Sequence, residues 1–244
     1  MEIGTLTEKS LHAALKLHYC PDAACHEVPV AGGLADICVD GVPIEIQTGN
    51  LNALKKKLAR YRRADVSPVR VVVPLIRKKR IIRTDPESGE CTQRMSPRHG
   101  QPWDVLYELS HIANELCDPC LCLTLVEVDV DEFRINDGTP RGKRTDRILT
   151  AYGREIPLNC TSDFSVMLPV ALPEPFTCAD FARATRVRPR RASAGLYVLR
   201  TVGAIRGEKD GRKMLYYRTD TERLENESGA RQDTHARGSV SETN

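Results

Sequence analysis

The run VRVVVPL, from Val69 to Leu75, most constrains how this chain can fold. Its apolar side chains do not alternate with polar ones, so a strand formed by this run must be covered on both faces. Strands of this kind lie inside α/β sheets, where helices pack on each side. The run therefore predicts an α/β domain whose other strands and covering helices come from the neighbouring segments.

The segments around this strand predict a mixed sheet. Leu6–Tyr19 has apolar residues at helical spacing. HEVPVAGGLADICVDG predicts a hairpin around Gly32-Gly33, and a further strand, VPIEIQT, follows the turn that ends it. A second helix is expected from about Leu51 to Tyr61, and Lys79–Thr84 is expected to be a short hairpin partner of the apolar strand.

The middle of the chain continues the α/β pattern. Asp85–Gly100 is rich in Pro, Gly and Ser, which indicates a loop. Pro102–Leu116 has an apolar side at helical spacing and predicts a helix. Leu121–Val130 predicts another strand, and the segment from Phe133 to Leu158 predicts a long β-excursion with a basic turn. Residues 1–170 are accordingly expected to form one domain.

The pattern changes at Pro173. A short helix over Thr177–Thr185, a turn, a second helix over Pro189–Val202 and a hairpin with a basic tip are the parts of a winged helix. We therefore predict a small winged-helix-like domain over residues 173–218. The last segment, Thr219–Asn244, is almost without apolar residues and is expected to be a disordered tail.

Positive charge is gathered in blocks, although the formal net charge is only +3. KKKLARYRR, RKKRIIR, RGKRTDR and RATRVRPRR are all cationic. Such blocks suit a polyanion, because each neutralised phosphate releases counterions. Solvated helix faces and loops are the alternative interpretation of any single block.

The cysteines and the lengths of the apolar segments indicate in which cellular compartment the chain is expected. Nine cysteines, an odd number, occur without a secretion signal, which favours reduced thiols in the cytoplasm. No run approaches the roughly 18 apolar residues of a membrane span, so no membrane partner is expected. Cys117, Cys120 and Cys122 have no second cysteine pair at ligand spacing and are more typical of buried thiols than of a zinc site.

Two acids are expected to converge on neighbouring strands. With a turn at Asp40-Gly41 the strands run antiparallel, so Asp36 and Glu45 can face each other. Gln47 lies on the same strand face as Glu45, two residues further on. Two carboxylates and a backbone carbonyl form a hard oxygen site that suits Mg²⁺, which takes few protein ligands. The ion could then polarise a phosphoryl oxygen and acidify bound water.

This arrangement resembles the PD-(D/E)XK nuclease superfamily, whose motif is an acid, a short gap and (D/E)-x-K. Asp36 and Glu45 match the acids, while Gln47 stands in place of the lysine, as in the E-x-Q variant of some restriction enzymes and CoiA-like competence proteins. IEIQTGNLNALKKKL is similar to the strand, turn and helix of that variant, and Glu8 matches the glutamate on the family's first helix. The resemblance covers roughly residues 1–83.

The resemblance implies a restriction-endonuclease-like core that cuts DNA with Mg²⁺, with Glu8, Asp36 and Glu45 as metal ligands. Asp36, Glu45 and Gln47 would be the catalytic set, and a lysine on the following helix could replace the missing charge. The residues expected to bind nucleic acid are Lys55, Lys56, Lys57, Arg188, Arg190, Arg191 and Arg212. His12 is not expected to act as a base.

Three alternatives stay open at this stage. DNA is the preferred substrate, but RNA is not ruled out. A single site would need a homodimer or two visits to break both strands. The rival interpretation is a non-catalytic DNA-binding or regulatory protein that acts through its winged helix, in which the nuclease fold has decayed.

Overall fold

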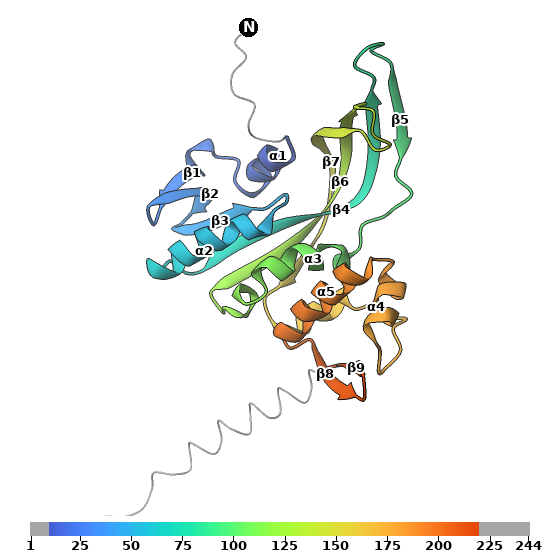
Figure 1. Cartoon of the computed structure of the whole chain (residues 1–244). Helices are drawn as coiled ribbons and strands as arrows, with labels where there is room; N and C mark the ends of the chain where they lie inside the picture. The colour runs from blue at the N-terminus through green and yellow to red at the C-terminus, as the bar shows by residue number, and fades with distance from the viewer. Residues whose placement is uncertain (1–9, 220–244) are drawn as a thin grey trace, which may run out of the picture.

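A computed structural model describes residues 10–219, which form a large mixed β-sheet with helices on both faces and a smaller hairpin (Figure 1). Along the large sheet the order is β1, β2, β3, β4, β6 and β7, and β5 pairs with β4. Among the described strands, β4 runs parallel to β3 and β6, while the other pairs are antiparallel. The predicted α/β class with a mixed sheet is therefore confirmed. The strands of the large sheet are β1 (His26–Val30), β2 (Gly33–Val39), β3 (Val42–Ile46), β4 (Val69–Thr84), β5 (Cys91–Met95), β6 (Leu121–Ile135) and β7 (Lys143–Leu158).

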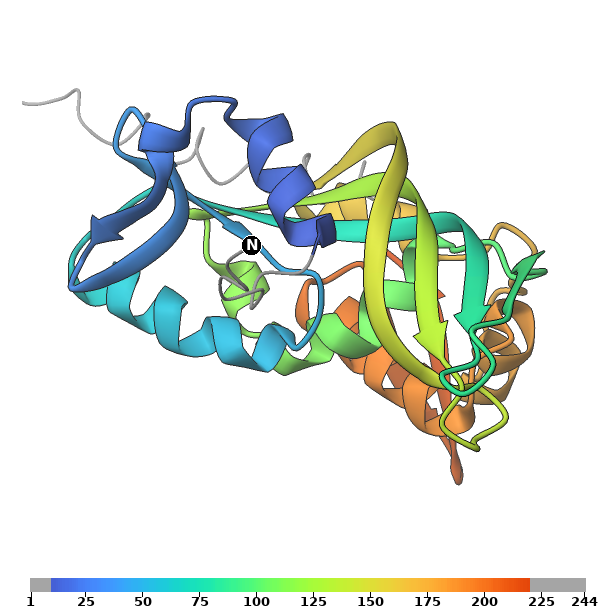
Figure 2. The ribbon, with the colours of Figure 1, turned by 90° about the horizontal axis from the view of Figure 1, so that it is seen from above.

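Helices cover both faces of this sheet. Figure 2 shows α1 on one face and α2 on the other. The helices are α1 (Ser10–Tyr19), α2 (Leu54–Arg63), α3 (Leu106–Leu109), α4 (Cys178–Thr185) and α5 (Pro189–Thr201), and the 3₁₀ turns are η1 (Ala23–Cys25), η2 (Leu51–Ala53), η3 (Pro102–Val105), η4 (Ser110–Ile112), η5 (Glu115–Cys117) and η6 (Thr161–Met167). No helix between residues 10 and 219 is long and apolar enough to cross a membrane.

The first half of β4 is buried on both faces, as its apolar sequence predicts. Val72 packs with Leu11 and Leu15 of α1 in one hydrophobic cluster. Val71 and Val73 lie in the other cluster, which includes the buried side of α2. Because successive residues of a strand point to opposite faces, one uninterrupted apolar run fills both layers.

The second half of β4 differs from the sequence prediction. β4 is one strand over Val69–Thr84, so the prediction of a separate hairpin partner at Lys79–Thr84 is wrong. This half pairs with β6 on one side and with β5 on the other. The basic residues do not end the strand because acids on β6 lie beside them, as in the ion pair between Arg80 and Asp131.

Two further segments correct the sequence prediction. The expected loop Asp85–Gly100 contains the exposed strand β5. The expected helix Pro102–Leu116 is broken into short turns, of which only α3 is α-helical. One cause lies at Ser110, whose hydroxyl donates a 2.6 Å hydrogen bond to the carbonyl of Tyr107 and so competes with regular helix bonding.

The C-terminal segment has the predicted order of two helices and a hairpin. After α4 and α5 come β8 (Ile205–Asp210) and β9 (Lys213–Arg218), and Phe176 forms a β-bridge with Tyr216. Phe181 and Leu196 belong to the same hydrophobic cluster as Leu106 of α3. This segment therefore packs against the α/β part through a shared core. Its assignment to a winged-helix domain stays a prediction, and the tail from residue 220 onwards lies outside the described residues.

Candidate metal centre

The β2–β3 hairpin sets the position of the two predicted acids. Its turn contains Asp40 and Gly41, whose φ angles of +50° and +80° allow the tight reversal. Ile37 pairs with Ile44 across the two strands. The same register, continued by one residue, places Asp36 opposite Glu45. The hairpin geometry inferred from the sequence is the one that the structure contains.

Both carboxylates contact one ammonium group. The Nζ atom of Lys57, on α2, lies 3.0 Å from Oδ1 of Asp36 and 2.5 Å from Oε2 of Glu45. The side chains of Asp36 and Lys57 keep 17% and 27% of their exposure, whereas the side chain of Glu45 has 0%. The cluster is thus open to solvent at Asp36 and Lys57. We call the cluster of Asp36, Glu45 and Lys57 the acid pair site.

Asp36 is held from several directions. Its Oδ2 accepts a 2.8 Å hydrogen bond from the backbone N–H of Ile46 and lies 3.3 Å from Nε2 of His12 on α1. Burial by itself would raise the pKa of this carboxyl. The hydrogen bonds from His12, Lys57 and Ile46 outweigh burial, so the pKa of Asp36 lies well below its usual range. Asp36 is therefore ionised at neutral pH.

Glu45 lies in a different environment. It is fully buried, and its Oε1 accepts a 2.5 Å hydrogen bond from the hydroxyl of Tyr61. Burial and the nearby negative charge of Asp36 raise the pKa of Glu45, and the hydrogen bonds from Lys57 and Tyr61 offset only part of that rise. Burial and the contact with Glu45 also raise the pKa of the Tyr61 phenol, which stays a donor at neutral pH.

The three predicted lysines of α2 divide into two groups. Lys55 and Lys56 are exposed, and only Lys57 of the three forms an ion pair within the described residues. Residues four apart lie on one side of a helix, so Lys57 and Tyr61 reach the acids together. Burial lowers the pKa of Lys57, but the bonds to Glu45 and Asp36 have the larger effect and raise it.

Gly33, at the start of β2, lies against the side chain of Arg60 on α2. A Cβ atom at Gly33 would lie 2.3 Å from Cζ of Arg60, one residue before Tyr61. The guanidinium of Arg60 thus occupies the space that a side chain at position 33 would need. Because the guanidinium is the far end of a flexible side chain, a larger residue at position 33 would displace Arg60 rather than the helix that carries Lys57 and Tyr61.

The remaining predicted site residues are placed as follows. Gln47 follows β3 directly, and its backbone N–H donates a 2.8 Å hydrogen bond to the carbonyl of Val72. Within residues 10–219 its side-chain amide has no hydrogen-bond partner. Glu8 lies outside the described residues. Arg188, Arg190 and Arg191 are exposed at the start of α5, and Arg212 is exposed at the tip of the β8–β9 hairpin.

The oxygen donors of the acid pair site suit a hard cation that takes few protein ligands. Asp36 and Glu45 direct oxygens from adjacent strands at one point, where the ammonium of Lys57 now supplies the positive charge. Mg²⁺ is bound by one or two carboxylates and keeps several waters. No group of three or more His, Cys, Asp or Glu side chains suited to a metal occurs within residues 10–219. The described chain therefore offers two carboxylate ligands.

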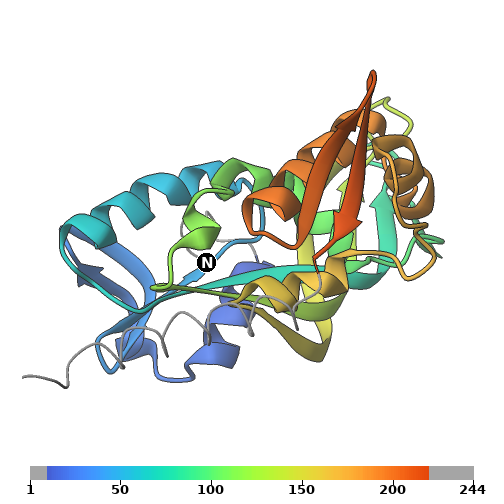
Figure 3. The same cartoon turned by 90° about the horizontal axis from the view of Figure 1, so that it is seen from below.

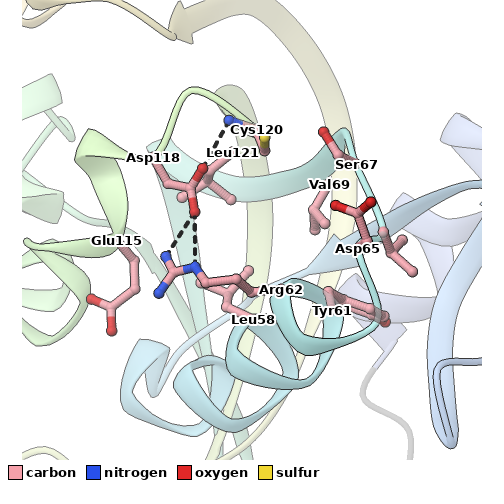
Figure 4. A pocket seen from close by; sticks show the side chains of 11 residues that line it. Leu58, Tyr61, Arg62, Asp65, Ser67, Val69, Glu115, Asp118, Cys120 and Leu121 are labelled. Carbon is pink, nitrogen blue, oxygen red and sulfur yellow. Dashed lines mark hydrogen bonds and ion pairs between the residues drawn. The ribbon is translucent and has the colours of Figure 1, made fainter.

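A cavity of about 280 Å³ lies on the other side of Tyr61, between the end of α2 and the starts of β4 and β6. Leu58 and Leu121 form part of its apolar wall. In Figure 4 the carboxylate of Asp118 lies between the guanidinium of Arg62 and the backbone N–H of Cys120. Tyr61 contributes to this cavity while its hydroxyl binds Glu45, so one side chain joins the cavity wall to the acid pair site.

Sequence reasoning did not identify Tyr61 as a site residue. A usable signal is present in KKKLARY, where a tyrosine follows a lysine by four residues on a helix after the E-x-Q strand. The contact between His12 and Asp36 also supplies a role that the sequence did not suggest: it orients an acid and lowers its pKa.

Comparisons with known proteins place this chain in a family. Residues 9–159 match the family model described as a domain of unknown function, DUF8091. An uncharacterized protein of Treponema pallidum (strain Nichols) is 31% identical over 224 residues, which covers 88% of this chain and 87% of the relative. No solved structure matches. Since the family model spans more than half of the chain, the chain belongs to the DUF8091 family.

Proposed function

We propose that the acid pair site is the centre of a Mg²⁺-dependent endonuclease of PD-(D/E)XK type that hydrolyses phosphodiester bonds of DNA. One observation carries the proposal: carboxylates from two adjacent strands meet at the ammonium of Lys57, and the hydroxyl of Tyr61 on the same helix binds one of them. Within residues 10–219 these two carboxylates share one ammonium, which neutralises only one of two ionised carboxylates. A site with this charge favours a divalent cation.

Each side chain has a defined part in this proposal. Asp36 and Glu45 would hold the cation, and His12, Ile46 and Tyr61 keep the two carboxylates in place through their hydrogen bonds. A bound Mg²⁺ would supply Lewis-acid stabilisation of the phosphoryl oxygens and acidify a bound water.

Lys57, which contacts both carboxylates, would supply beside the scissile phosphate the positive charge that the family's lysine provides. The amide of Gln47, free of partners in the described chain, would orient the water or the phosphate. In this proposal the lysine of the family motif is replaced in function by a lysine on α2, ten residues beyond Gln47. Glu8 would add a third ligand.

The test is cleavage of supercoiled DNA by the purified protein with and without Mg²⁺. Glu45→Gln and Asp36→Asn keep the shape of each side chain and remove its charge. We expect each to lower the nicking rate by at least ~100-fold, equivalent to about 2.7 kcal/mol of transition-state stabilisation. Glu87→Gln, at an exposed loop position, is the matched control and should leave the rate unchanged. Cleavage of a labelled RNA shows whether RNA is also a substrate. Analytical ultracentrifugation shows whether the protein is a monomer or a homodimer.

A second candidate function is favoured by Gln47 and by the complete burial of Glu45. Glutamine cannot supply the charge of the family's lysine, and a buried carboxylate bonded to Lys57 and Tyr61 also suits a purely structural role. In that case the chain would bind DNA through its C-terminal segment without cutting it. If the wild type and Glu45→Gln are equally inactive while both shift a duplex in a gel, this second function replaces the first.

A further inference from the structure

Two adjoining cavities form a groove between the β4–β5 arm and the C-terminal helices. The larger has a volume of about 680 Å³ and is lined by residues that include His99, Trp103 and Arg186. The smaller has a volume of about 250 Å³ and is lined by residues that include Lys79 and Arg191. Arg98 and Asp104 line both cavities, so the two adjoin each other. We call this surface the Trp103 groove.

The groove carries excess positive charge. Its one carboxylate, that of Asp104, is already bonded to Arg98 and to the backbone N–H of Gln101. Within residues 10–219 neither Arg186 nor Arg191 forms an ion pair with a carboxylate. The guanidinium of Arg191 instead lies 4.9 Å from the centre of the Tyr107 ring. Two guanidinium groups are thus left to bind anionic groups of a ligand.

Trp103 gives the groove an aromatic wall. It is the single tryptophan of the chain. Trp103 is half-buried: part of its side chain packs against the main hydrophobic cluster, and part lines the larger cavity. A tryptophan fixed from behind by a core and open at the front is a platform on which a planar ring can stack.

We propose that the Trp103 groove binds single-stranded nucleic acid, with an unpaired base stacked on Trp103 and the adjoining phosphates bound by Arg186 and Arg191. Guanidinium groups bind phosphate oxygens through paired hydrogen bonds, and any base can stack on an indole. A paired base within a duplex could not reach the indole face, so the groove selects unpaired segments. The choice of a nucleic acid among polyanions rests on the proposed nuclease function.

The groove and the acid pair site are close enough for one strand to reach both. β4 passes both places: Val71 pairs with Glu45, and Lys79 lines the groove. Eight residues of strand span at most roughly 26 Å at about 3.3 Å each. α2, α3 and α5 lie in a row on the same face of the sheet (Figure 3).

Because Trp103 is the only tryptophan, its fluorescence reports on this groove alone. In EDTA, where no cleavage can occur, a 20-nucleotide single strand should quench the emission saturably. A strand of equal length that lacks bases should compete for binding but quench much less, and a blunt duplex of the same sequence should quench weakly. If the strand without bases or the duplex quenches as strongly as the single strand, no base stacks on Trp103. If none of the three quenches the emission, the groove is not a binding site.

Substitutions test whether Arg186 and Arg191 contact phosphates directly or only add to the positive charge of the surface. Arg186→Asn with Arg191→Gln should weaken single-strand binding and lower the slope of log affinity against log salt by ~1.4, about 0.7 for each phosphate that is no longer neutralised. Asn also tolerates the positive φ of residue 186. Arg183→Gln, one turn earlier on α4 and 79% exposed, is the control and should leave both quantities unchanged. An unchanged slope in the double variant would overturn the phosphate contacts.

This test is independent of the cleavage assay. Quenching without nicking would retain the groove and reject the proposed nuclease. Nicking without quenching would retain the nuclease and reject the groove. Trp103→Phe, measured with a labelled strand, keeps a smaller ring in the same place. It should bind more weakly than the wild type, and equal binding would contradict a role for the indole.

Discussion

Two glutamates of the same sheet, Glu45 and Glu132, are both fully buried, yet their surroundings are opposite in charge. Glu45 has a second carboxylate and one ammonium beside it. Glu132 has three cations beside it: Lys79, Arg134 and Arg147.

The pKa values of the two glutamates respond in opposite directions. Burial alone would raise both. At Glu132 the hydrogen bonds from Arg134 and Arg147 outweigh burial and lower the pKa to about 2. At Glu45 burial and the charge of Asp36 dominate, and the pKa is raised. Glu132 thus has three cations beside it, whereas Glu45 shares one ammonium with a second carboxylate.

Under the proposed function, this contrast separates a structural carboxylate, Glu132, from one that takes part in chemistry, Glu45. A carboxylate surrounded by cations fixes strands β4, β6 and β7 together. In the proposed nuclease, the two carboxylates that share one ammonium would instead hold a divalent cation. The three predictions that follow test this contrast.

The largest effect is expected for Glu132→Gln. Loss of the charge leaves three half-buried cations facing one another, and removing one partner of a buried ionic group typically costs ~3–5 kcal/mol of unfolding free energy. Urea unfolding at pH 7 measures the loss. Glu127→Gln is the matched control: its partners Arg77 and Arg154 are 43% and 65% exposed, so the loss should be about 1 kcal/mol.

The loss at Glu132→Gln should also depend on pH. Because the folded-state pKa of Glu132 lies at about 2, below its unfolded value of ~4.3, its stabilisation is present above pH ~4.3 and disappears as the pH falls toward about 2. The difference in unfolding free energy between the wild type and the variant should therefore shrink across that window. A constant difference would show that the charge of Glu132 contributes nothing.

A smaller effect, about 2 kcal/mol at pH 7, is expected for Lys57→Met. Without the ammonium, the repulsion between Asp36 and Glu45 raises the pKa of the pair above its unfolded value. The folded state then binds more protons than the unfolded state, so stability should rise as the pH is lowered from 7 toward 4. Thermal unfolding between those values measures the recovery.

Lys56→Met removes the same charge from the exposed neighbour and should change the unfolding free energy by less than about 0.5 kcal/mol. Mg²⁺ should stabilise Lys57→Met more than the wild type, since the ion no longer has to displace an ammonium. If neither acid nor Mg²⁺ restores stability, the two carboxylates do not form an acid pair.

The smallest effect is expected for Tyr61→Phe, which removes the hydroxyl bonded to Glu45 and should cost about 1 kcal/mol. This hydrogen bond lowers the pKa of Glu45, so its loss should raise that pKa further. If the ionised carboxylate holds the cation, the acidic limb of the pH–rate profile for nicking should move to higher pH. If the acidic limb of the profile does not move, the hydroxyl of Tyr61 does not influence the ionisation on which the reaction depends.

The acid pair could be predicted from the sequence because it depends on local geometry. A two-residue turn fixes the register of β2 and β3, and the register fixes which side chains face each other. The three adjacent lysines were suggested instead by the resemblance to E-x-Q nucleases, in which Gln47 replaces the motif lysine. Which of the three lysines reaches the acids depends on the rotational phase of α2. That phase in turn depends on the residue at which the helix begins.

The cluster around Glu132 could not be predicted in this way. Lys79 and Glu132 are 53 residues apart, and Arg147 comes from a third strand. RKKRIIR suggested a break in the strand because the sequence does not show which distant acids compensate the charge. Tyr61 was missed for a related reason, since a buried tyrosine normally indicates packing rather than a hydrogen bond to a site.

The shared hydrophobic core has a consequence for how this family can vary. The family model ends at residue 159, yet Phe164, Phe181 and Leu199 belong to the same hydrophobic cluster as Leu106 and Leu123. An exchange of the last third of the gene between relatives would bring together apolar surfaces that had not adapted to each other. The two portions of this chain should therefore be inherited as one piece.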